Sequence, residues 1–501
     1  MSDTIAAIAT GGAISAIGIV RVSGCGAIIA ADKMFRPANG TRLINAGNRH
    51  MYYGELTGAD GVLIDLCLCM VSRAPDSYTG EDTVEFHCHG SPVVLSETLR
   101  VLFSHGVRQA GPGEFTKRAF LNGRMDLTQA EAVIDLIEAE TPMAAQNAAG
   151  QLRGAVGIRL ESVYNALLDI IAHFHAVVDY PDEDIDEFKV QHYLSVLRGA
   201  QGELSRILST HERGRVLRDG VPTAIVGRPN TGKSSLLNAL LGYDRAIVTD
   251  LPGTTRDTVE EKIIIGGVVL RLIDTAGLRD VDNKVEKLGV ERTLAALRGA
   301  GLAILVLDGS EPLRSEDYEA LRSIPSDVPM LVVVNKSDLP GILGTDELAE
   351  LAGSSSSTLW ADPCNKKYEN GSSPTHHRPP STSHRPPSTI HLQPADRVRY
   401  LRVSALTGEG LTDLDAEIRN MFPEFGTPPS GEIITNARQA GAISRALDRL
   451  GLAMAAIGSS VTPDAVLTDL EDALAALGEV TGKTMREDLI SRIFERFCVG
   501  K

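Results

Sequence analysis

The apolar positions of the chain change their spacing from one region to the next, and these changes predict its organisation. Short β-rich runs separated by turns, such as residues 17–22 and 62–68, fill residues 1 to about 120 and predict a compact α+β domain. The spacing becomes helical from about residue 125 to 215, and again over about the last 70 residues. One helix face is marked by Val156, Leu160, Val163, Leu167 and Ile170, and a second by Leu467, Leu470, Leu474 and Leu477.

Four short apolar runs between the two helical regions predict buried strands, at residues 221–226, 268–273, 330–334 and 400–403. A polar loop follows each run, which is typical of a parallel-sheet α/β domain. We therefore expect an N-terminal domain at residues 1–122 and a helical domain split into 123–218 and 429–501 around an inserted α/β domain at 219–428. The two helical halves should pack together, because neither can bury its apolar stripe alone.

The first of these runs leads into a phosphate-binding loop, Gly-Arg-Pro-Asn-Thr-Gly-Lys-Ser at residues 227–234. Its glycines let backbone N–H groups turn towards a phosphate, and the N-terminus of the following helix favours anions. Lys233 offers a positive charge to the outer phosphates, and Ser234 offers a hydroxyl to Mg²⁺. The expected nucleotide contacts in this loop are Asn230, Thr231, Gly232, Lys233, Ser234 and Ser235.

Later segments indicate that the nucleotide is GTP. Asn-Lys-Ser-Asp follows the third run, and the carboxylate of Asp338 can accept hydrogen bonds from the ring N–H and amine of guanine, a pair that adenine cannot donate. Asp274 should orient a water bound to Mg²⁺, and Thr255 is the expected switch threonine on Mg²⁺. These segments extend the predicted GTP site by Thr249, Asp250, Leu251, Pro252, Gly253, Thr254, Thr255, Asp274, Thr275, Ala276, Gly277, Asn335, Lys336, Asp338, Ser404, Ala405 and Leu406.

The group that positions the attacking water is not the usual glutamine. Leu278 occupies that place, and its side chain cannot hydrogen-bond to water. Among the acidic residues that follow, Glu286 is our candidate, with a solvated helix face as the alternative explanation of these charges. The side-chain oxygen of Asn230 and the carbonyls of residues 249–254 could hold a monovalent cation such as K⁺, which would stabilise charge that develops on the phosphates.

Composition restricts the other functions of the chain. The net charge of −16 argues against a simple basic nucleic-acid binder, and no apolar run reaches the ~18 residues that a membrane span requires. The N-terminal residues lack the basic start of a signal or transit peptide, and the six cysteines form no C-x-x-C pair. A reducing cytoplasm fits these features best.

Residues 353–395 differ from the rest because they are rich in Ser, Pro, His and Thr. His-Arg-Pro-Pro-Ser-Thr occurs there twice, at 377–382 and 384–389. Such a composition cannot bury enough apolar surface to offset its ordering entropy, so we expect a disordered insert, with a proline-motif docking site as the alternative. Either a lineage-specific insertion or an error in the gene model would account for it.

Segments outside the nucleotide motifs resemble the MnmE family of tRNA-modification GTPases, also called TrmE. The matching stretches are residues 18–24, 78–82, 112–115, 118–122, 126–132 and the C-terminal Phe-Cys-Val-Gly-Lys at 497–501. The resemblance spans the chain except for the insert. It implies a folate-binding-like α+β domain, a split helical domain and an inserted Ras-like P-loop GTPase domain. It further implies a K⁺-dependent GTPase that works with the flavin-dependent partner MnmG (GidA). The two would add an aminomethyl or carboxymethylaminomethyl group to C5 of the wobble uridine in certain tRNAs.

The resemblance also implies individual roles. Mg²⁺ would be held by Ser234 and Thr255, K⁺ would be held by Asn230, Thr249, Leu251 and Thr254, and Glu286, Lys233 and Cys498 would be catalytic. A 5-formyl- or methylene-tetrahydrofolate derivative would contact Arg21, Glu85, Arg124 and Lys501, with Arg124 standing where the family commonly has lysine. The implied assembly is a homodimer that joins MnmG in a heterotetramer or larger complex, binds tRNA and requires no membrane.

Three alternatives stay open at this point. Cys498 lies one helical turn past Phe494, where a buried small apolar residue is common. His87 and His89 share one strand face and could supply two metal ligands, although a packed strand end requires no metal. The chain as a whole could be a regulatory or ribosome-assembly GTPase switch without tRNA-modifying chemistry.

Overall fold

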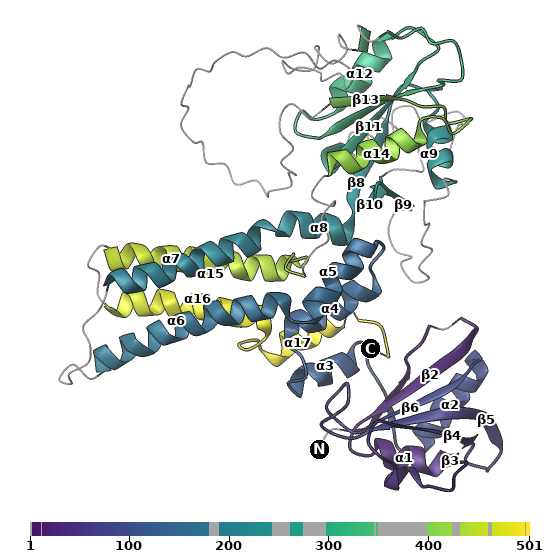
Figure 1. The fold of residues 1–501 in the computed structure, drawn as a ribbon, viewed down its shortest axis with the longest axis vertical. Coiled ribbons are helices and arrows are strands. Elements are labelled where there is room, and N and C mark those ends of the chain that lie inside the picture. Colours follow the sequence, from purple (N-terminus) through teal and green to yellow (C-terminus); the bar gives the residue numbers. More distant parts are fainter. Residues whose placement is uncertain are drawn as a thin grey trace. The chain divides into compact units, whose positions relative to one another are not determined.

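The structure, a computed structural model, divides the chain into two compact units (Figure 1). Unit 1 comprises residues 1–138, 148–208 and 437–501, and unit 2 comprises residues 139–147 and 209–436. The described residues are 3–11, 13–179, 190–242, 261–273, 297–344, 347–348, 398–422, 431–458, 463–495 and 497–500.

Unit 1 begins with a seven-stranded sheet of order β3-β4-β5-β6-β2-β1-β7. Neighbouring strands are antiparallel except for the pair β1 and β7. The strands are β1 (Ile5–Ile8), β2 (Ser15–Ser23), β3 (Phe35–Pro37), β4 (His50–Thr57), β5 (Leu63–Ser72), β6 (Thr83–Gly90) and β7 (Arg108–Gln109). The β-rich runs expected at residues 17–22 and 62–68 correspond to β2 and β5.

Helices α1 (Ala27–Met34) and α2 (Pro92–Ser104), together with the short 3₁₀ helix η1 (Leu43–Asn45), pack against this sheet. Their shared core includes the buried side chains of Phe86 and Leu102. The helices supply the apolar cover that one face of an antiparallel sheet needs.

Strand β6 shows how the two faces differ. Val84, Phe86 and Cys88 are buried in the core, whereas Glu85 and His87 between them are half-buried on the other face. Side chains alternate between the two faces of a sheet along each strand. Polar side chains of β6 and its neighbour β2 therefore lie together on the face away from α1 and α2.

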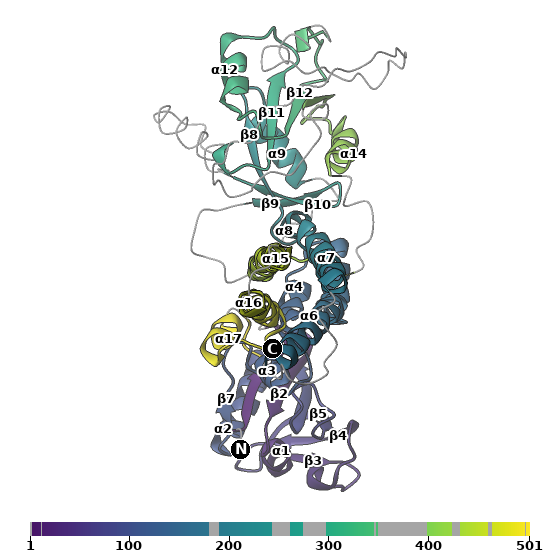
Figure 2. The ribbon, with the colours of Figure 1, turned by 90° about the vertical axis from the view of Figure 1, so that its left-hand side faces the viewer.

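The remainder of unit 1 is helical, and its four long helices α6, α7, α15 and α16 lie side by side in both views (Figures 1 and 2). The helices are α3 (Glu114–Leu121), α4 (Leu127–Ile137), α6 (Ala155–Asp179), α7 (Val190–Ser209), α15 (Ala437–Gly458), α16 (Pro463–Thr481) and α17 (Glu487–Phe494). Helix α5 (Pro142–Leu152) contains a boundary between the units. The two halves of the helical region therefore pack together, as predicted.

The predicted helix faces hold with one correction. All five apolar positions expected on α6 are buried. On α16 the buried stripe is Val466, Leu470, Ala473 and Leu477, whereas Leu467 and Leu474 are only half-buried. At two of the four expected positions the buried residue thus lies one place before the leucine, because valine and alanine also fill core positions.

Unit 2 contains a six-stranded sheet of order β13-β12-β11-β8-β10-β9, parallel except for the hairpin of β9 and β10. Its strands are β8 (Val221–Val226), β9 (Glu261–Ile265), β10 (Val268–Leu272), β11 (Leu302–Asp308), β12 (Met330–Asn335) and β13 (Val398–Arg402). The helices are α8 (His211–Asp219), α9 (Lys233–Leu241), α12 (Ser315–Ser323) and α14 (Leu411–Met421).

The parallel-sheet α/β domain predicted between two helical stretches is confirmed by these elements. All seven residues of β11 and all six of β12 are buried, as expected for strands covered on both faces. Among the described residues, no helix combines the length and apolarity needed to cross a bilayer.

Candidate functional site

The phosphate loop lies between the end of β8 and the start of α9, as its sequence predicts. Gly232, which precedes α9, has a φ of 91°, and a Cβ atom there would lie 2.2 Å from Nδ2 of Asn335. Asn230 also adopts a left-handed conformation, with a φ of 66°. Ser234 is half-buried and Ser235 is exposed on the first turn of the helix. The loop therefore has the tight backbone path that brings N–H groups round an anion.

Lys233 points back over the loop. Its Nζ donates to the carbonyl oxygens of Gly227 and Arg228, at 2.8 and 2.7 Å. Burial, and next the charge of Arg228, lower the pKa of Lys233 to about 8, while the charge of Asp317 opposes the shift. The negative charge of a phosphate in place of these carbonyls would raise the pKa of Lys233 again.

Asn335 joins the three nucleotide motifs that the structure describes. Its Nδ2 donates to the carbonyl of Thr231 in the phosphate loop at 2.9 Å, and its Oδ1 accepts from the backbone N–H of Ala405 at 3.0 Å. The side chain is buried. Residues predicted from separate motifs, 104 and 70 positions away from Asn335, are thus brought together.

The residues that follow Asn335 are also held in place. Asp338 Oδ1 accepts a hydrogen bond from the Ser404 hydroxyl at 2.6 Å, which ties the Asn-Lys-Ser-Asp loop to the Ser-Ala loop. Lys336 has a φ of 66°, and its Nζ donates to Asp308 at 2.5 Å. Burial raises the pKa of Asp308, but hydrogen bonds from Lys336 and Ser310 outweigh it and leave that pKa below its usual value. Leu406, by contrast, is largely exposed.

One further contact of the phosphate loop was missed in the sequence. Arg228 is buried, and its guanidinium donates to Glu311 at 2.8 Å and to the buried Asp317 of α12 at 3.2 Å. These acids are 83 and 89 residues away, so no local pattern could have indicated them. The ion pairs fasten the loop to α12 through Asp317 and to the segment before it through Glu311.

A second polar cluster lies on the open face of the N-terminal sheet. The Arg21 guanidinium carbon lies 5.3 Å from the ring centre of Tyr78 and 5.6 Å from that of Phe115. Its Nε donates to Glu85 at 2.7 Å. The neighbouring His87, together with Arg21, lowers the pKa of Glu85 to about 2, while burial opposes them. A charged pair between two aromatic rings can bind a flat ring that carries polar groups.

Tyr78 of this cluster is held in place through its hydroxyl group. Its hydroxyl shares a hydrogen bond with the Thr116 hydroxyl at 2.9 Å, and burial raises the pKa of Tyr78. Arg124 is exposed, and its side chain lies beside Gly80, in the same loop as Tyr78. Arg21, Glu85 and Arg124 therefore lie on one part of unit 1.

The last described residues approach the same part of unit 1. Val499 pairs with Pro112 in an antiparallel bridge, and the Cys498 carbonyl accepts from the N–H of Gly113 at 3.2 Å. Gly500 has a φ of 102°, and a Cβ atom there would lie 2.2 Å from the carbonyl oxygen of Ile8. Cys498 is exposed, so its interpretation as a buried packing residue is wrong.

The two histidine rings of β6 contact different carboxylates. His87 Nε2 lies 3.4 Å from Glu85, whereas His89 Nδ1 lies 2.7 Å from Asp65. The alternation of the strand was read correctly, but each ring faces a carboxylate of its own. Cys88 between them points into the core.

Several predicted positions lie outside the described residues. They are Thr249, Asp250, Leu251, Pro252, Gly253, Thr254, Thr255, Asp274, Thr275, Ala276, Gly277, Glu286, Lys501 and the segment 353–395.

Comparison with known proteins agrees over nearly the whole chain. Residues 127–498 match the model of the MnmE helical domain, and residues 4–124 match that of the GTP-binding protein TrmE N-terminus. Two proteins named tRNA modification GTPase MnmE are each 40% identical to this chain. The alignment with the Latilactobacillus sakei protein spans 503 residues, and that with the Symbiobacterium thermophilum protein spans 499. The alignments cover 100% of this chain and 98% and 99% of those proteins.

Among solved structures, the G domain of the T. maritima FeoB iron transporter is 22% identical, with a TM-score of 0.23. That match covers 41% of this chain and 98% of the other, and it is too distant to support a site. Because one family model spans more than half of the chain and the relatives align over its full length, the chain belongs to the MnmE family of tRNA modification GTPases.

Proposed function

We propose that the chain is a K⁺-dependent GTPase that, with a flavin-dependent MnmG-type partner, modifies C5 of the wobble uridine in certain tRNAs. The observation that supports this most is the convergence of the phosphate loop and both guanine-side loops on Asn335, in a chain of this family. The acceptor tRNA and the reducing cytoplasm follow from the same family membership.

The nucleotide would bind along the carboxyl ends of β8 and β12. Lys233 would leave the loop carbonyls for the outer phosphates, and Asp338 would accept hydrogen bonds from guanine. Ser234 and Thr255 would hold Mg²⁺, and Asn230, Thr249, Leu251 and Thr254 would hold K⁺. The half-buried Ser234 and the left-handed Asn230 fit these roles, because both stand on the loop that encloses the phosphates. The two cations would stabilise developing phosphate charge, while Glu286 would position the attacking water.

The aromatic and charged cluster of unit 1 would hold a tetrahydrofolate derivative. Arg21 and Glu85 offer a donor and an acceptor side by side, and the ring faces of Tyr78 and Phe115 border them. Arg124 and Lys501 would add positive charge for the glutamate tail of the folate. This group would supply the one-carbon unit, and the exposed Cys498 would act in the modification step.

The assembly we propose is a homodimer that joins the flavin partner in a heterotetramer or larger complex. The net charge of −16 suggests that the partner supplies much of the positive surface for tRNA. Size-exclusion chromatography with light scattering, with and without GDP and a transition-state mimic, should give at least a dimer.

Mass spectrometry of wobble uridines tests the proposal directly. In a deletion strain, the wild-type gene should restore the modified nucleosides, whereas Glu286→Ala and Cys498→Ser should not. Purified Cys498→Ser should keep its GTP turnover, and wild-type turnover should be much faster in potassium than in sodium buffer. Unmodified uridines after complementation with the wild type, or equal turnover in the two buffers, would refute the proposal and favour a GTPase switch.

The guanine assignment has its own test. Asp338→Asn should lose GTP and gain xanthosine triphosphate, because an asparagine amide donates to the extra carbonyl that xanthine carries. Asp413→Asn, an exposed position on α14, is the matched control and should keep GTP preference. If Asp338→Asn still prefers GTP, Asp338 does not contact guanine.

A further inference from the structure

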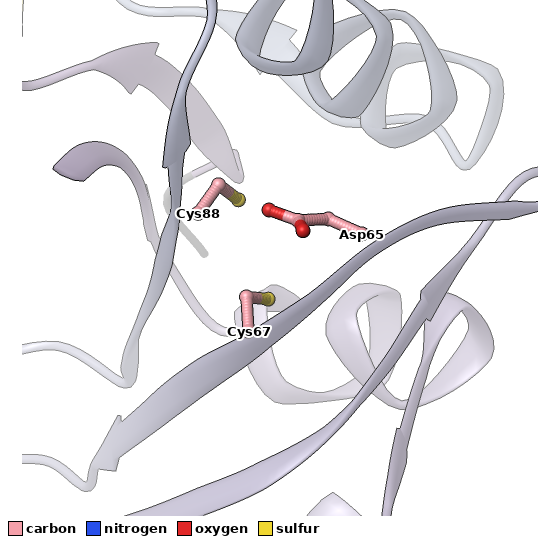
Figure 3. A group of neighbouring side chains, drawn as sticks. All are labelled: Asp65, Cys67 and Cys88. Carbon is pink, nitrogen blue, oxygen red and sulfur yellow. The ribbon is translucent and has the colours of Figure 1, made fainter. Parts of the chain in front are cut away.

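A carboxylate and two thiols that the proposed function does not use lie together on the core side of the N-terminal sheet. The carboxylate of Asp65 and the sulfur atoms of Cys67 and Cys88 all lie within 4.8 Å of one another (Figure 3). Asp65 and Cys67 come from β5 and Cys88 from β6. Since Leu68 pairs with His87 in the antiparallel register, Cys67 and Cys88 face each other across the two strands.

Both thiols are buried, with exposed fractions of 4% for Cys67 and 1% for Cys88. Asp65 is also largely covered, with 9% of its side chain exposed. In Figure 3 the Cys88 sulfur faces the carboxylate, and the Cys67 sulfur lies across the same small space. Burial of a carboxylate beside two ionisable thiols has a cost unless a positive charge compensates it.

A second layer of contacts fixes the carboxylate. His89 Nδ1 lies 2.7 Å from Asp65 Oδ1, and the backbone N–H of His89 donates to Oδ2 at 2.8 Å. The backbone N–H of Leu66 also donates to Oδ1 at 2.8 Å, so Oδ2, with one hydrogen bond from these groups, keeps a lone pair for another partner. Metal-binding carboxylates and imidazoles in proteins are commonly oriented by such outer hydrogen bonds.

From this geometry we propose that Asp65, Cys67 and Cys88 bind a thiophilic divalent cation of the zinc class, with a water molecule as fourth ligand. Thiolate and carboxylate ligands at ~2.0–2.3 Å from a tetrahedral ion lie roughly 3.5 Å apart, so side-chain rotations suffice to close the site. On binding, each thiol releases its proton to solvent. The two thiolates, the carboxylate and the dication sum to one negative charge.

The bound ion would brace β5 against β6 at one point. Cys88 lies on the opposite face of β6 from Glu85 and His87. The cation would thus be structural, and it would stiffen the strand that presents Glu85 to the proposed folate site without touching it.

Cobalt substitution tests the site in the full-length protein. After reduction and chelation, one equivalent of Co²⁺ should give a sulfur-to-cobalt charge-transfer band, and Zn²⁺ should abolish that band. Cys67→Ser and Cys88→Ser should lose the band, and His89→Ala should weaken metal affinity about tenfold. Cys69→Ser is the matched control, because Cys69 is equally buried on β5 but is not part of the group.

A second measurement, the rate of thiol alkylation in the wild type, tests the site even if a serine variant does not fold. In the wild type, Zn²⁺ should slow alkylation of Cys67 and Cys88 but not of the exposed Cys25, as peptide mass spectrometry would read out. No charge-transfer band in the wild type, a band that persists in both serine variants, or a Cys67–Cys88 disulfide in protein purified without reductant would overturn the proposal. GDP affinity should be the same in all variants, because the site lies in unit 1 and the phosphate loop in unit 2.

Discussion

The amide of Asn335 uses both of its ends, one on the phosphate loop and one on the loop after β13. It is a neutral group with no charge to give to a nucleotide. Its role is therefore to hold two loops in register, so that the phosphate and base contacts form at a fixed separation.

Replacement of Asn335 by alanine should weaken this link. The carbonyl of Thr231 and the N–H of Ala405 would lose their partners, which should destabilise unit 2 by about 1–3 kcal/mol and weaken GDP binding. Urea unfolding and titration with a fluorescent GDP analogue measure both effects. Asn238→Ala, an exposed position on α9, is the control, and equal behaviour of the two variants would contradict the assignment.

The lowered pKa of Lys233 predicts a pH dependence of nucleotide binding. Below about pH 8 the ammonium group is already charged in the free protein, so affinity should change little. Above this value, binding of a phosphate must take up a proton, and affinity should fall by up to about tenfold per pH unit. Calorimetry of GDP binding at about pH 8.5 in two buffers of different ionisation enthalpy should detect the proton. Lys233→Arg keeps its charge over this range, so any remaining pH dependence in that variant would assign the effect to another group.

At the scale of elements, local signals in the sequence predicted four of the six strands of the unit 2 sheet, and β9 and β11 were missed. β8 has the bounds predicted for it, and α9 follows the phosphate loop as expected, because the strand, the loop and the helix follow one another directly in the sequence. Contacts between distant elements left no such signal. In the sequence, nothing marks Arg228 as the partner of Asp317, because only the fold brings α12 to the phosphate loop. Likewise, no residue near Arg21 in the sequence indicates its contacts with the rings of Tyr78 and Phe115. Arg21 and Glu85 were found only through resemblance to a family.

The segment after α17 is held by backbone contacts that a single side chain can disturb. Gly500→Ala would place its Cβ atom against the Ile8 carbonyl and should detach residues 497–500 from β1. Hydrogen–deuterium exchange should then rise in peptides that contain Gly113, whose N–H donates to Cys498. Gly61→Ala also faces a left-handed φ but open space, so it should leave that exchange unchanged. Equal exchange in the two variants would show that steric contact at Gly500 does not hold the segment.

At the scale of the whole molecule, the helical region is assembled from two distant parts of the chain. Arg438 of α15 forms two hydrogen bonds with Glu131 of α4, at 2.9 and 2.7 Å, and Gln439 donates to the same carboxylate. Glu131 is buried. The guanidinium also donates to the carbonyl of Glu479 in α16, so one side chain joins three helices.

Arg438→Met should therefore leave Glu131 buried without its counter-charge and destabilise unit 1 by about 3–5 kcal/mol. Arg445→Met is the control on the same helix, since Arg445 pairs with Glu479 at the surface and should cost less than about 1 kcal/mol. Urea unfolding followed by exchange in unit 1 peptides measures the difference, with GDP affinity unchanged in both. Similar losses in the two variants would mean that the buried pair does not join the halves.

The split of the helical region has a consequence for biosynthesis. Glu131 and Arg438 are 307 residues apart, so α4 and α6 leave the ribosome long before α15 and α16 exist. During that interval the nucleotide-binding unit is synthesised and can fold. The apolar face of α6 meanwhile lacks the C-terminal helices that cover it in the finished protein. Exposed stripes of this kind recruit chaperones and promote aggregation. Yield on expression should therefore depend on translation speed and chaperone supply more than the stability of the finished protein would suggest.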